Sequence, residues 1–290
     1  MTLTTDTLTL EIEPLSPVLG ASVRGIDLSK PVDDRTAEAM IDAFHKYSFL
    51  CFPGQEISAD DQLRFANLFG KGDGAVRGAK KQGKTRTGNR GVMYVSNVLE
   101  NGKPIGVLPD GEMQFHSDGA HRDSPYRATT LYGIKIPSKG GDTLFANLHA
   151  AYDALSPSMK DRIAGLKTQF VYDYDAQERN FTDDDDAGLP RAEHDLVRTH
   201  PATGRKSLYL SRLMTRRIVD MESAEGEALL LDLFDHAEKP EFVYAHSWNP
   251  DDLVVWDNRC LNHARTDFPA EEERMLRRYT VSEPDAPDDR

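Results

Sequence analysis

The last two thirds of the chain consist of short runs rich in β-branched and aromatic residues, each followed by residues that favour a turn. Turn signals containing Pro, Gly, Asn or Asp occur at residues 137–141, 201–204 and 249–252. The runs span residues 92–98, 128–136, 142–146, 196–199, 205–211, 241–248, 253–256 and 273–281. Many short strands separated by turns are typical of a jelly roll or a β-sandwich. The pattern therefore predicts a mainly β fold.

Helical periodicity flanks and interrupts these runs. Apolar residues recur at the spacing of one helix face in residues 33–47, and a capping-box pattern beginning at Ser58 predicts a second helix. Helical insertions are expected near residues 148–166 and 222–238. Since β-barrels and sandwiches of roughly 200 to 250 residues often form one unit, we expect residues 1–290 to form a single domain.

Residues 70–91 differ from the rest in being rich in glycine, lysine and arginine. We interpret them as a mobile loop, either a lid over a binding site or a solvated connection. The four consecutive aspartates Asp183–Asp186 are interpreted as a solvated loop, because a calcium loop needs alternating ligands at defined positions.

Charge, hydropathy and cysteine content limit the binding partners and the cellular location that we expect for this chain. With 35 basic against 48 acidic side chains, the formal net charge is −13, which disfavours binding to nucleic acid. No run of about 20 apolar residues and no signal-peptide pattern is present, so no membrane association is expected. The two cysteines, Cys51 and Cys260, exclude a disulfide framework. We therefore expect a cytoplasmic protein.

A histidine and a carboxylate two residues apart, His116 and Asp118, occur in a strand-like context. Side chains at positions i and i+2 of a strand share a face, so both could bind one metal ion. Taken alone the motif is common, and a hydrogen-bonded structural pair is the simpler interpretation.

His263, directly after another strand-like run, changes this balance. Two histidines and one carboxylate form the facial triad of non-haem Fe(II) oxygenases, which leaves three coordination positions open. Zinc is the rival metal, because Cys260 and His263 form a Cys-x-x-His pair. Since that pair has no partner pair, we interpret Cys260 as a packing residue.

Arg274 and Arg278 lie four residues apart in the last strand-like run and would share one strand face. Buried guanidinium groups are costly unless paired. Bidentate binding of small-molecule carboxylates would explain them, and so would pairing with acidic side chains of the chain itself.

Several motifs occur in a recognisable order: His116-x-Asp118, Gly140–Leu144, Val197–Pro201, Trp256–Arg259, His263, and Arg274 with Arg278. From about residue 8 to residue 283, the chain resembles the taurine dioxygenase and 2,4-dichlorophenoxyacetate dioxygenase family. The resemblance implies a double-stranded β-helix, a cupin-like jelly roll. It also implies catalysis with Fe(II), with 2-oxoglutarate as co-substrate, and with O2.

The resemblance also implies roles for individual residues. His116, Asp118 and His263 would bind iron and form the catalytic centre. Arg274 would bind the distal carboxylate of 2-oxoglutarate together with Thr143, and Arg278 would bind an anionic group of the substrate. Trp256 matches a family tryptophan near the metal, although a core position explains it equally well. No catalytic role is expected for His200. The carboxylate of Asp118 argues against a halogenating enzyme, because the halogenating relatives lack a carboxylate at this position.

The implied reaction is hydroxylation of a small anionic organic substrate, most simply one bearing a carboxylate, with release of succinate and CO2. Cleavage of an ether bond would follow if the hydroxylated carbon carries oxygen. A sulfonate or sulfate-ester dioxygenase is the alternative within the family. A cupin-like metal-dependent hydrolase or isomerase and a non-catalytic binding protein are the alternatives outside it. Because members of the family often form dimers or tetramers, we also expect a homo-oligomer.

Overall fold

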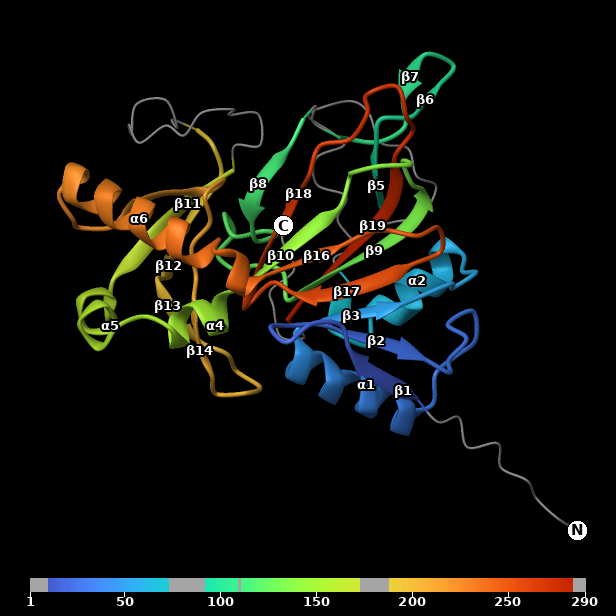
Figure 1. The fold of residues 1–290 in the computed structure, drawn as a ribbon, viewed down its shortest axis with the longest axis horizontal. Coiled ribbons are helices and arrows are strands. Elements are labelled where there is room, and N and C mark those ends of the chain that lie inside the picture. The colour runs from blue at the N-terminus through green and yellow to red at the C-terminus, as the bar shows by residue number, and fades with distance from the viewer. Residues whose placement is uncertain (1–9, 73–91, 109–110, 173–187, 284–290) are drawn as a thin grey trace, which may run out of the picture.

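The computed structural model describes residues 10–72, 92–108, 111–172 and 188–283. Its larger part contains two sheets that face one another (Figure 1). The first sheet is 8-stranded, with β2 and β3 parallel and its other pairs antiparallel. Its strands, in spatial order, are β1 (Glu11–Pro14), β2 (Ala21–Arg24), β3 (Phe49–Phe52), β17 (Leu253–Asp257), β9 (Ala128–Lys135), β19 (Met275–Ser282) and β4 (Lys71–Gly72), and β5 (Met93–Ser96) also pairs with β19.

The second sheet is 4-stranded and antiparallel. It contains β16 (Val243–His246), β10 (Thr143–Asn147), β18 (Leu261–Arg265) and β8 (Met113–His116) in that order. Side chains from both sheets form one apolar core between them, including Phe49, Leu131, Phe145, Trp256 and Leu276. The mainly β fold, predicted from short runs of β-branched and aromatic residues separated by turn signals, is confirmed.

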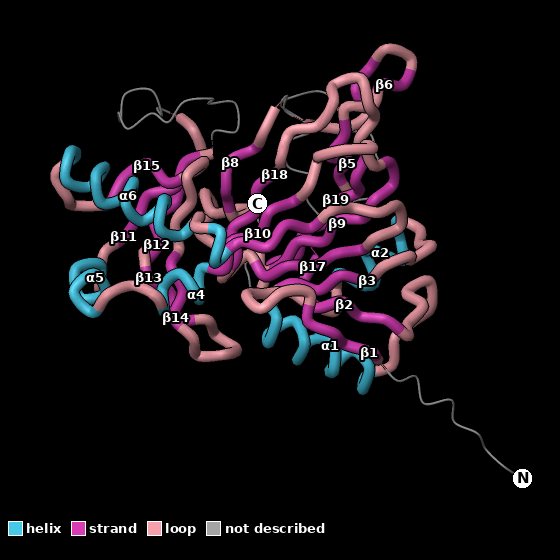
Figure 2. The backbone as a smooth tube through the Cα atoms, in the orientation of Figure 1, coloured by secondary structure: helices cyan, strands magenta, loops and turns pink. Residues whose placement is uncertain are grey.

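Two helices cover the outer face of the first sheet, α1 (Asp34–Tyr47) and α2 (Ala59–Ala66) (Figure 2). Asp33 caps α1 by accepting a hydrogen bond from the Thr36 backbone N–H, and the predicted capping box at Ser58 is present. Because helices pack on one face and the inter-sheet core on the other, all five residues of β17 are buried. This explains why the run at residues 253–256 is apolar throughout rather than alternating.

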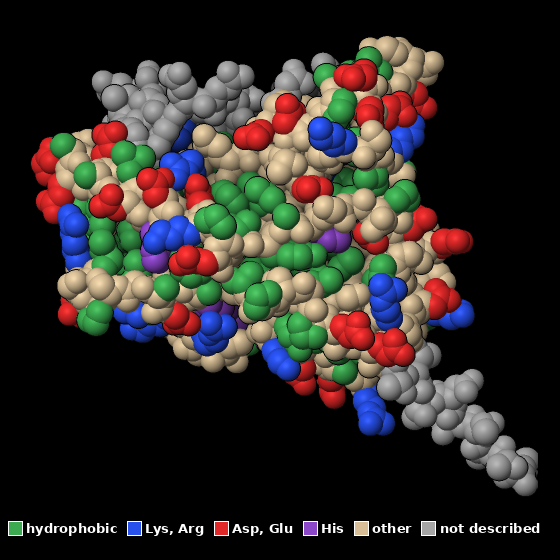
Figure 3. All heavy atoms as spheres, viewed as in Figure 1, with side chains coloured by type: hydrophobic (Ala, Val, Ile, Leu, Met, Phe, Trp, Pro, Cys, Tyr) green, Lys and Arg blue, Asp and Glu red, His purple; other side chains and the backbone are tan. Residues whose placement is uncertain are grey.

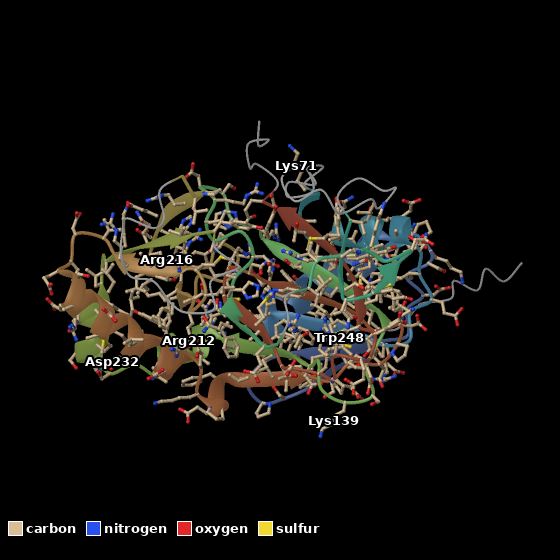
Figure 4. All side chains as sticks on the ribbon, turned by 90° about the horizontal axis from the view of Figure 1, so that it is seen from above. Lys71, Lys139, Arg212, Arg216, Asp232 and Trp248 are labelled. Carbon is tan, nitrogen blue, oxygen red and sulfur yellow. The ribbon has the colours of Figure 1, made fainter. Side chains whose placement is uncertain are left out.

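A separate group of elements packs beside the sheets around its own apolar core. It contains α4 (Leu148–Asp153), α5 (Pro157–Ile163), α6 (Ser223–Ala237), η1 (Pro240–Phe242), β11 (Lys167–Val171), β12 (Arg191–Asp195), β13 (Val197–Thr199), β14 (Lys206–Leu208) and β15 (Thr215–Ile218). In Figure 4, Arg212, Arg216 and Asp232 lie in this group, and Trp248 lies among the strands of the two sheets. The range expected as one helical insertion holds two helices, because Ser156 caps a new helix with Pro157 at its start.

The surface carries a short hairpin and a mixture of charges. The hairpin, β6 (Leu99–Glu100) and β7 (Lys103–Pro104), projects from the sheets. Acidic and basic side chains are interspersed on the face shown in Figure 3. None of the helices in the described ranges combines the length and apolar character of a transmembrane span. Residues 73–91, most of the predicted loop, and the aspartate run Asp183–Asp186 lie outside the described residues.

Candidate active site

Strand pairing brings the two candidate histidines together. β8 and β18 are antiparallel neighbours, and His116 at the end of β8 is the register partner of His263 in β18. Their ring centroids are 4.1 Å apart. Facing residues of adjacent strands have neighbouring side chains, so this register is what joins two motifs far apart in the sequence.

Asp118 completes this group from the turn that follows β8. Its Oδ1 atom lies 4.0 Å from His116 Nε2 and 3.9 Å from His263 Nε2. The carboxylate is 1 % exposed and His116 is 3 % exposed. One atom from each of the three side chains falls within 4.8 Å of the others, a spacing at which they could hold one metal ion.

The proton states of these groups suit metal binding. His116 Nδ1 lies 2.9 Å from the carbonyl oxygen of Gln114, which can only accept, so Nδ1 carries the proton and Nε2 keeps its lone pair. Burial lowers the pKa of His116 and of His263, which keeps both rings neutral. Burial alone would raise the pKa of Asp118, but the positive charge of Arg278 holds it below its ordinary value. The donor set is therefore two neutral imidazoles and one anion.

Arg278 points into the same space from β19. Its Nη2 atom is 2.7 Å from Asp118 Oδ1, and its side chain is 21 % exposed. Leu276, two residues earlier, lies in the core between the sheets, as the predicted alternation along this strand requires. Pairing with an acidic residue of the chain, one of the two explanations offered for the arginines, therefore holds for Arg278.

Arg274 lies directly before β19 and has a different environment. It is 2 % exposed, and its Nε and Nη2 atoms donate to the carbonyl oxygen of Gly141 at 3.2 and 3.0 Å. Its Nη1 atom is buried with no hydrogen-bond partner among the described residues. Burial, reinforced by the charge of Arg265, lowers the pKa of Arg274 to about 9. A guanidinium this poorly compensated is suited to receive an anion.

Gly141 allows this arrangement. A Cβ atom at this position would lie 3.1 Å from Arg274 Nε, and the backbone has φ +70°, a region that favours glycine. Thr143, two residues later in β10, is 3 % exposed, and its hydroxyl accepts a hydrogen bond of 3.0 Å from Trp248 Nε1. The hydroxyl keeps a proton to donate, so Thr143 and Arg274 can serve the same ligand.

The remaining candidates occupy structural positions. Trp256 is fully buried, with its ring centroid 4.7 Å from that of His263, so it lies beside the candidate metal ligands. Cys260 lies in the core between the sheets and groups with His200 and Asp257 rather than with His263. The zinc interpretation of the Cys-x-x-His pair therefore has no support from this geometry.

Two residues that pattern reasoning missed touch the site. Thr129 in β9 donates a 2.6 Å hydrogen bond to Asp118 Oδ2, and Asn258 bonds to Thr129 in turn. Asn258 stands in the Trp256–Arg259 motif, which was a usable signal. Nothing in the run 128–136 distinguishes Thr129 from its neighbour Thr130.

A cluster of two histidines and one carboxylate inside a jelly roll matches the donor set of non-haem Fe(II) oxygenases. Comparison with known proteins identifies the family. A family model described as taurine catabolism dioxygenase TauD, TfdA family matches residues 11–280. The chain therefore belongs to this family and is a 2-oxoglutarate-dependent non-haem iron dioxygenase, which uses Fe(II), 2-oxoglutarate and O2.

Individual relatives agree with this assignment. The chain is 32 % identical over 284 residues to the alpha-ketoglutarate-dependent 2,4-dichlorophenoxyacetate dioxygenase of Cupriavidus pinatubonensis, covering 92 % of this chain and 96 % of the relative. It is also 32 % identical over 286 residues to pentalenolactone F synthase of Streptomyces arenae, covering 92 % and 94 %. Among solved structures, AAD-2 in complex with Mn(II) and N-oxalylglycine matches with a TM-score of 0.81 at 33 % identity, covering 97 % and 99 %. The predicted double-stranded β-helix and family are confirmed, and equal identity to two differently named enzymes does not select a substrate.

Proposed function

We propose that this dioxygenase hydroxylates a small organic anion, most simply a carboxylate, and forms succinate and CO2 from 2-oxoglutarate. The observation that carries the proposal is the guanidinium of Arg278 beside the candidate metal ligands, 21 % exposed and 2.7 Å from Asp118, which is 1 % exposed. The similar enzyme from Cupriavidus pinatubonensis, named for a substrate with a carboxylate, supports the choice of anion.

His116, Asp118 and His263 would hold the iron. This donor set fits a divalent cation, since one carboxylate offsets part of its charge while the neutral imidazoles offer lone pairs. When bound, Fe(II) supplies the O2-dependent chemistry that couples decarboxylation of 2-oxoglutarate to hydroxylation of the substrate. The protein contributes three fixed ligands and a space shielded from water.

Arg274 and Thr143 would orient 2-oxoglutarate by its distal carboxylate. The unpartnered Nη1 of Arg274 and the hydroxyl proton of Thr143 can each donate to this group. In a buried position such bonds are strong, because water does not compete with them. This contact would set the direction in which the other end of 2-oxoglutarate reaches the metal ligands.

Arg278 would bind the anionic group of the substrate. A guanidinium carries five N–H donors in a planar fork, so it can contact Asp118 and a second anion at once. Holding the substrate by this group places a neighbouring carbon near the iron. If the hydroxylated carbon carries an ether oxygen, the product breaks down to an alcohol and a carbonyl compound.

A succinate-release screen tests the proposal. The chain is incubated with Fe(II), 2-oxoglutarate and O2 against panels of carboxylates, sulfonates and sulfate esters. We expect oxygen-dependent succinate formation stimulated by carboxylates, and a raised KM for that substrate in Arg278→Ala. Stimulation by sulfonates or sulfate esters alone would transfer the assignment to the alternative within the family. Turnover without O2 would contradict the reaction itself.

The homo-oligomer, the single catalytic domain and the cytoplasmic location stay predictions.

A further inference from the structure

The two oxygens of Asp118 have different surroundings. Oδ1 lies 4.0 Å from His116 Nε2, 3.9 Å from His263 Nε2 and 2.7 Å from Arg278 Nη2. Oδ2 instead accepts a hydrogen bond of 2.6 Å from the hydroxyl of Thr129. This division matters because a carboxylate that can rotate presents either oxygen, or both, to a metal ion.

Thr129 is firmly held by the sheet. It lies in β9 between β17 and β19, where its register partners are Trp256 and Thr280. It is 0 % exposed. Its side chain points between the two sheets, because Leu131 on the same strand face belongs to the inter-sheet core. The hydroxyl therefore has a fixed position relative to Asp118.

Asn258 determines which way the Thr129 hydroxyl points. Its Oδ1 accepts from Trp256 Nε1 at 2.9 Å and from the Asp118 backbone N–H at 3.4 Å. Both partners can only donate, so the amide oxygen must face them and the amide nitrogen must face Thr129. The Nδ2 atom accordingly donates to Thr129 Oγ1 at 2.9 Å.

A direction of hydrogen bonding follows along this chain of groups. Because Asn258 Nδ2 only donates, the Thr129 oxygen accepts there and sends its single proton to Asp118 Oδ2. Oδ2 is thus the acceptor at the end of this chain of hydrogen bonds. The backbone of Asn258 adds to the anchorage, since its carbonyl oxygen accepts a 2.8 Å hydrogen bond from the hydroxyl of Ser117.

We propose that Thr129 and Asn258 are positioning residues that fix the orientation of the Asp118 carboxylate and present its Oδ1 alone to the metal ion. The inference rests on the proposed function of His116, Asp118 and His263 as metal ligands. It adds two residues that do not bind the metal themselves but orient one of its ligands. Groups that orient metal ligands typically change metal affinity by about 10- to 100-fold when removed.

The test measures Mn(II) affinity by electron paramagnetic resonance, without turnover. Thr129→Val removes the hydroxyl and keeps the side-chain shape, and we expect its dissociation constant to rise by about 10- to 100-fold. Thr129→Ser keeps the hydroxyl, and we expect an affinity close to that of the wild type. If Thr129→Val does not fold, Thr129→Ala removes the same hydroxyl without placing a methyl group beside Asp118.

Thr130→Val is the matched control. Thr130 is the next residue of β9 and is 1 % exposed, but its hydroxyl donates to the Tyr279 carbonyl oxygen and accepts from Gln62 on the helix-covered side. It loses a buried hydroxyl from the same strand and should keep wild-type Mn(II) affinity. Equal loss in both variants, or none in Thr129→Val, would overturn the inference. A wild-type chain that binds no Mn(II), or one that binds as well after His116→Ala, would instead contradict the proposed metal site.

Discussion

Two buried clusters in this molecule share residue types and differ in spacing. In one, Asp118 lies 4.0 Å from His116 Nε2 and 3.9 Å from His263 Nε2. In the other, Asp257 Oδ2 lies 3.0 Å from His200 Nε2 and 2.6 Å from Arg259 Nη2. By composition, His116, Asp118 and His263 could hold a metal ion, and so could His200 and Asp257 together with Cys260. The spacings indicate what bridges each pair.

A proton bridges about 3 Å, whereas a metal ion with bonds of about 2 Å to each ligand bridges more. His200 Nδ1 accepts from the backbone N–H groups of Ala202 and Thr203, so Nε2 carries the proton and donates to Asp257. His116 has the opposite tautomer, with its Nε2 lone pair toward Asp118. The same residue types thus form a directly hydrogen-bonded His–Asp pair in one place, at 3.0 Å, and His and Asp side chains 3.9 to 4.0 Å apart in the other.

Removing a ligand from the open cluster should have the largest effect. His116→Ala is expected to abolish succinate formation, because the proposed metal site would lose one of its three ligands. The matched variant His200→Ala should keep Mn(II) binding while losing about 1–3 kcal/mol of unfolding free energy through the lost hydrogen bond to Asp257. Succinate assays and calorimetry of both variants check this, and loss of Mn(II) binding in His200→Ala would break the distinction.

Next in size is the uncompensated arginine. Arg274→Gln should raise the KM for 2-oxoglutarate by more than about 100-fold, because the bound carboxylate would lose a buried cation whose removal typically costs about 3–5 kcal/mol. Arg277→Gln is the control from the same segment, since Arg277 instead donates to Gln62 Oε1 and the Ile57 carbonyl oxygen. An unchanged KM for 2-oxoglutarate in Arg274→Gln would place that co-substrate elsewhere.

The cluster of Asp257, His200 and Arg259 should make the stability of the fold depend on pH in the acidic range. Burial alone would raise the pKa of Asp257, but Arg259 and His200 hold it below its ordinary value of 3.8. The ion pair therefore stabilises the fold above about pH 4, and this stabilisation is lost as the pH falls further. Asp257→Asn should lower the unfolding free energy by about 3 kcal/mol at pH 7. In denaturant titrations, the difference from wild type should shrink toward low pH, and a constant difference would contradict the pKa shift.

A third group, Cys51, His246 and Asp252, should show the smallest effect. Burial raises the pKa of the Cys51 thiol to about 12 and lowers that of His246 to about 4. Asp252 Oδ2 accepts from the backbone N–H of Asn249 and so closes a turn. Because metal ligands must be deprotonated, Cys51→Ala should leave the stoichiometry at one Mn(II) per chain. Two ions per wild-type chain, with one lost in Cys51→Ala, would show that this cluster also binds metal.

Local patterns predicted much of the fold. The capping box at Ser58 and the apolar run at residues 253–256 each depend on neighbours in the chain, and each is present. The strands β11, β12 and β15 were missed. Their sheet depends on pairing between residues far apart, such as Lys167 with Asp195, and short segments carry little of that information.

The candidate site divides in the same way. His116 and Asp118 were found from their spacing, and Arg274 and Arg278 from charge on an apolar strand. The contrast between the arginines could not be predicted, because Arg278 has Asp118 as its partner and Arg274 has a backbone carbonyl. Thr129 was indistinguishable from Thr130 in the sequence, and only the packing of β9 between β17 and β19 separates their surroundings.

The amino-acid sequence by itself determined the alternation of strands and turns, the caps and the kinds of donor atom available. These depend on side-chain chemistry and on contacts within a few residues. Only the tertiary structure decided that His116 faces His263, that Asp118 divides its oxygens between Arg278 and Thr129, and that one His–Asp pair is closed while another is open. The reason is that register and distance between segments, at the scale of one ångström, are set by packing of the whole chain.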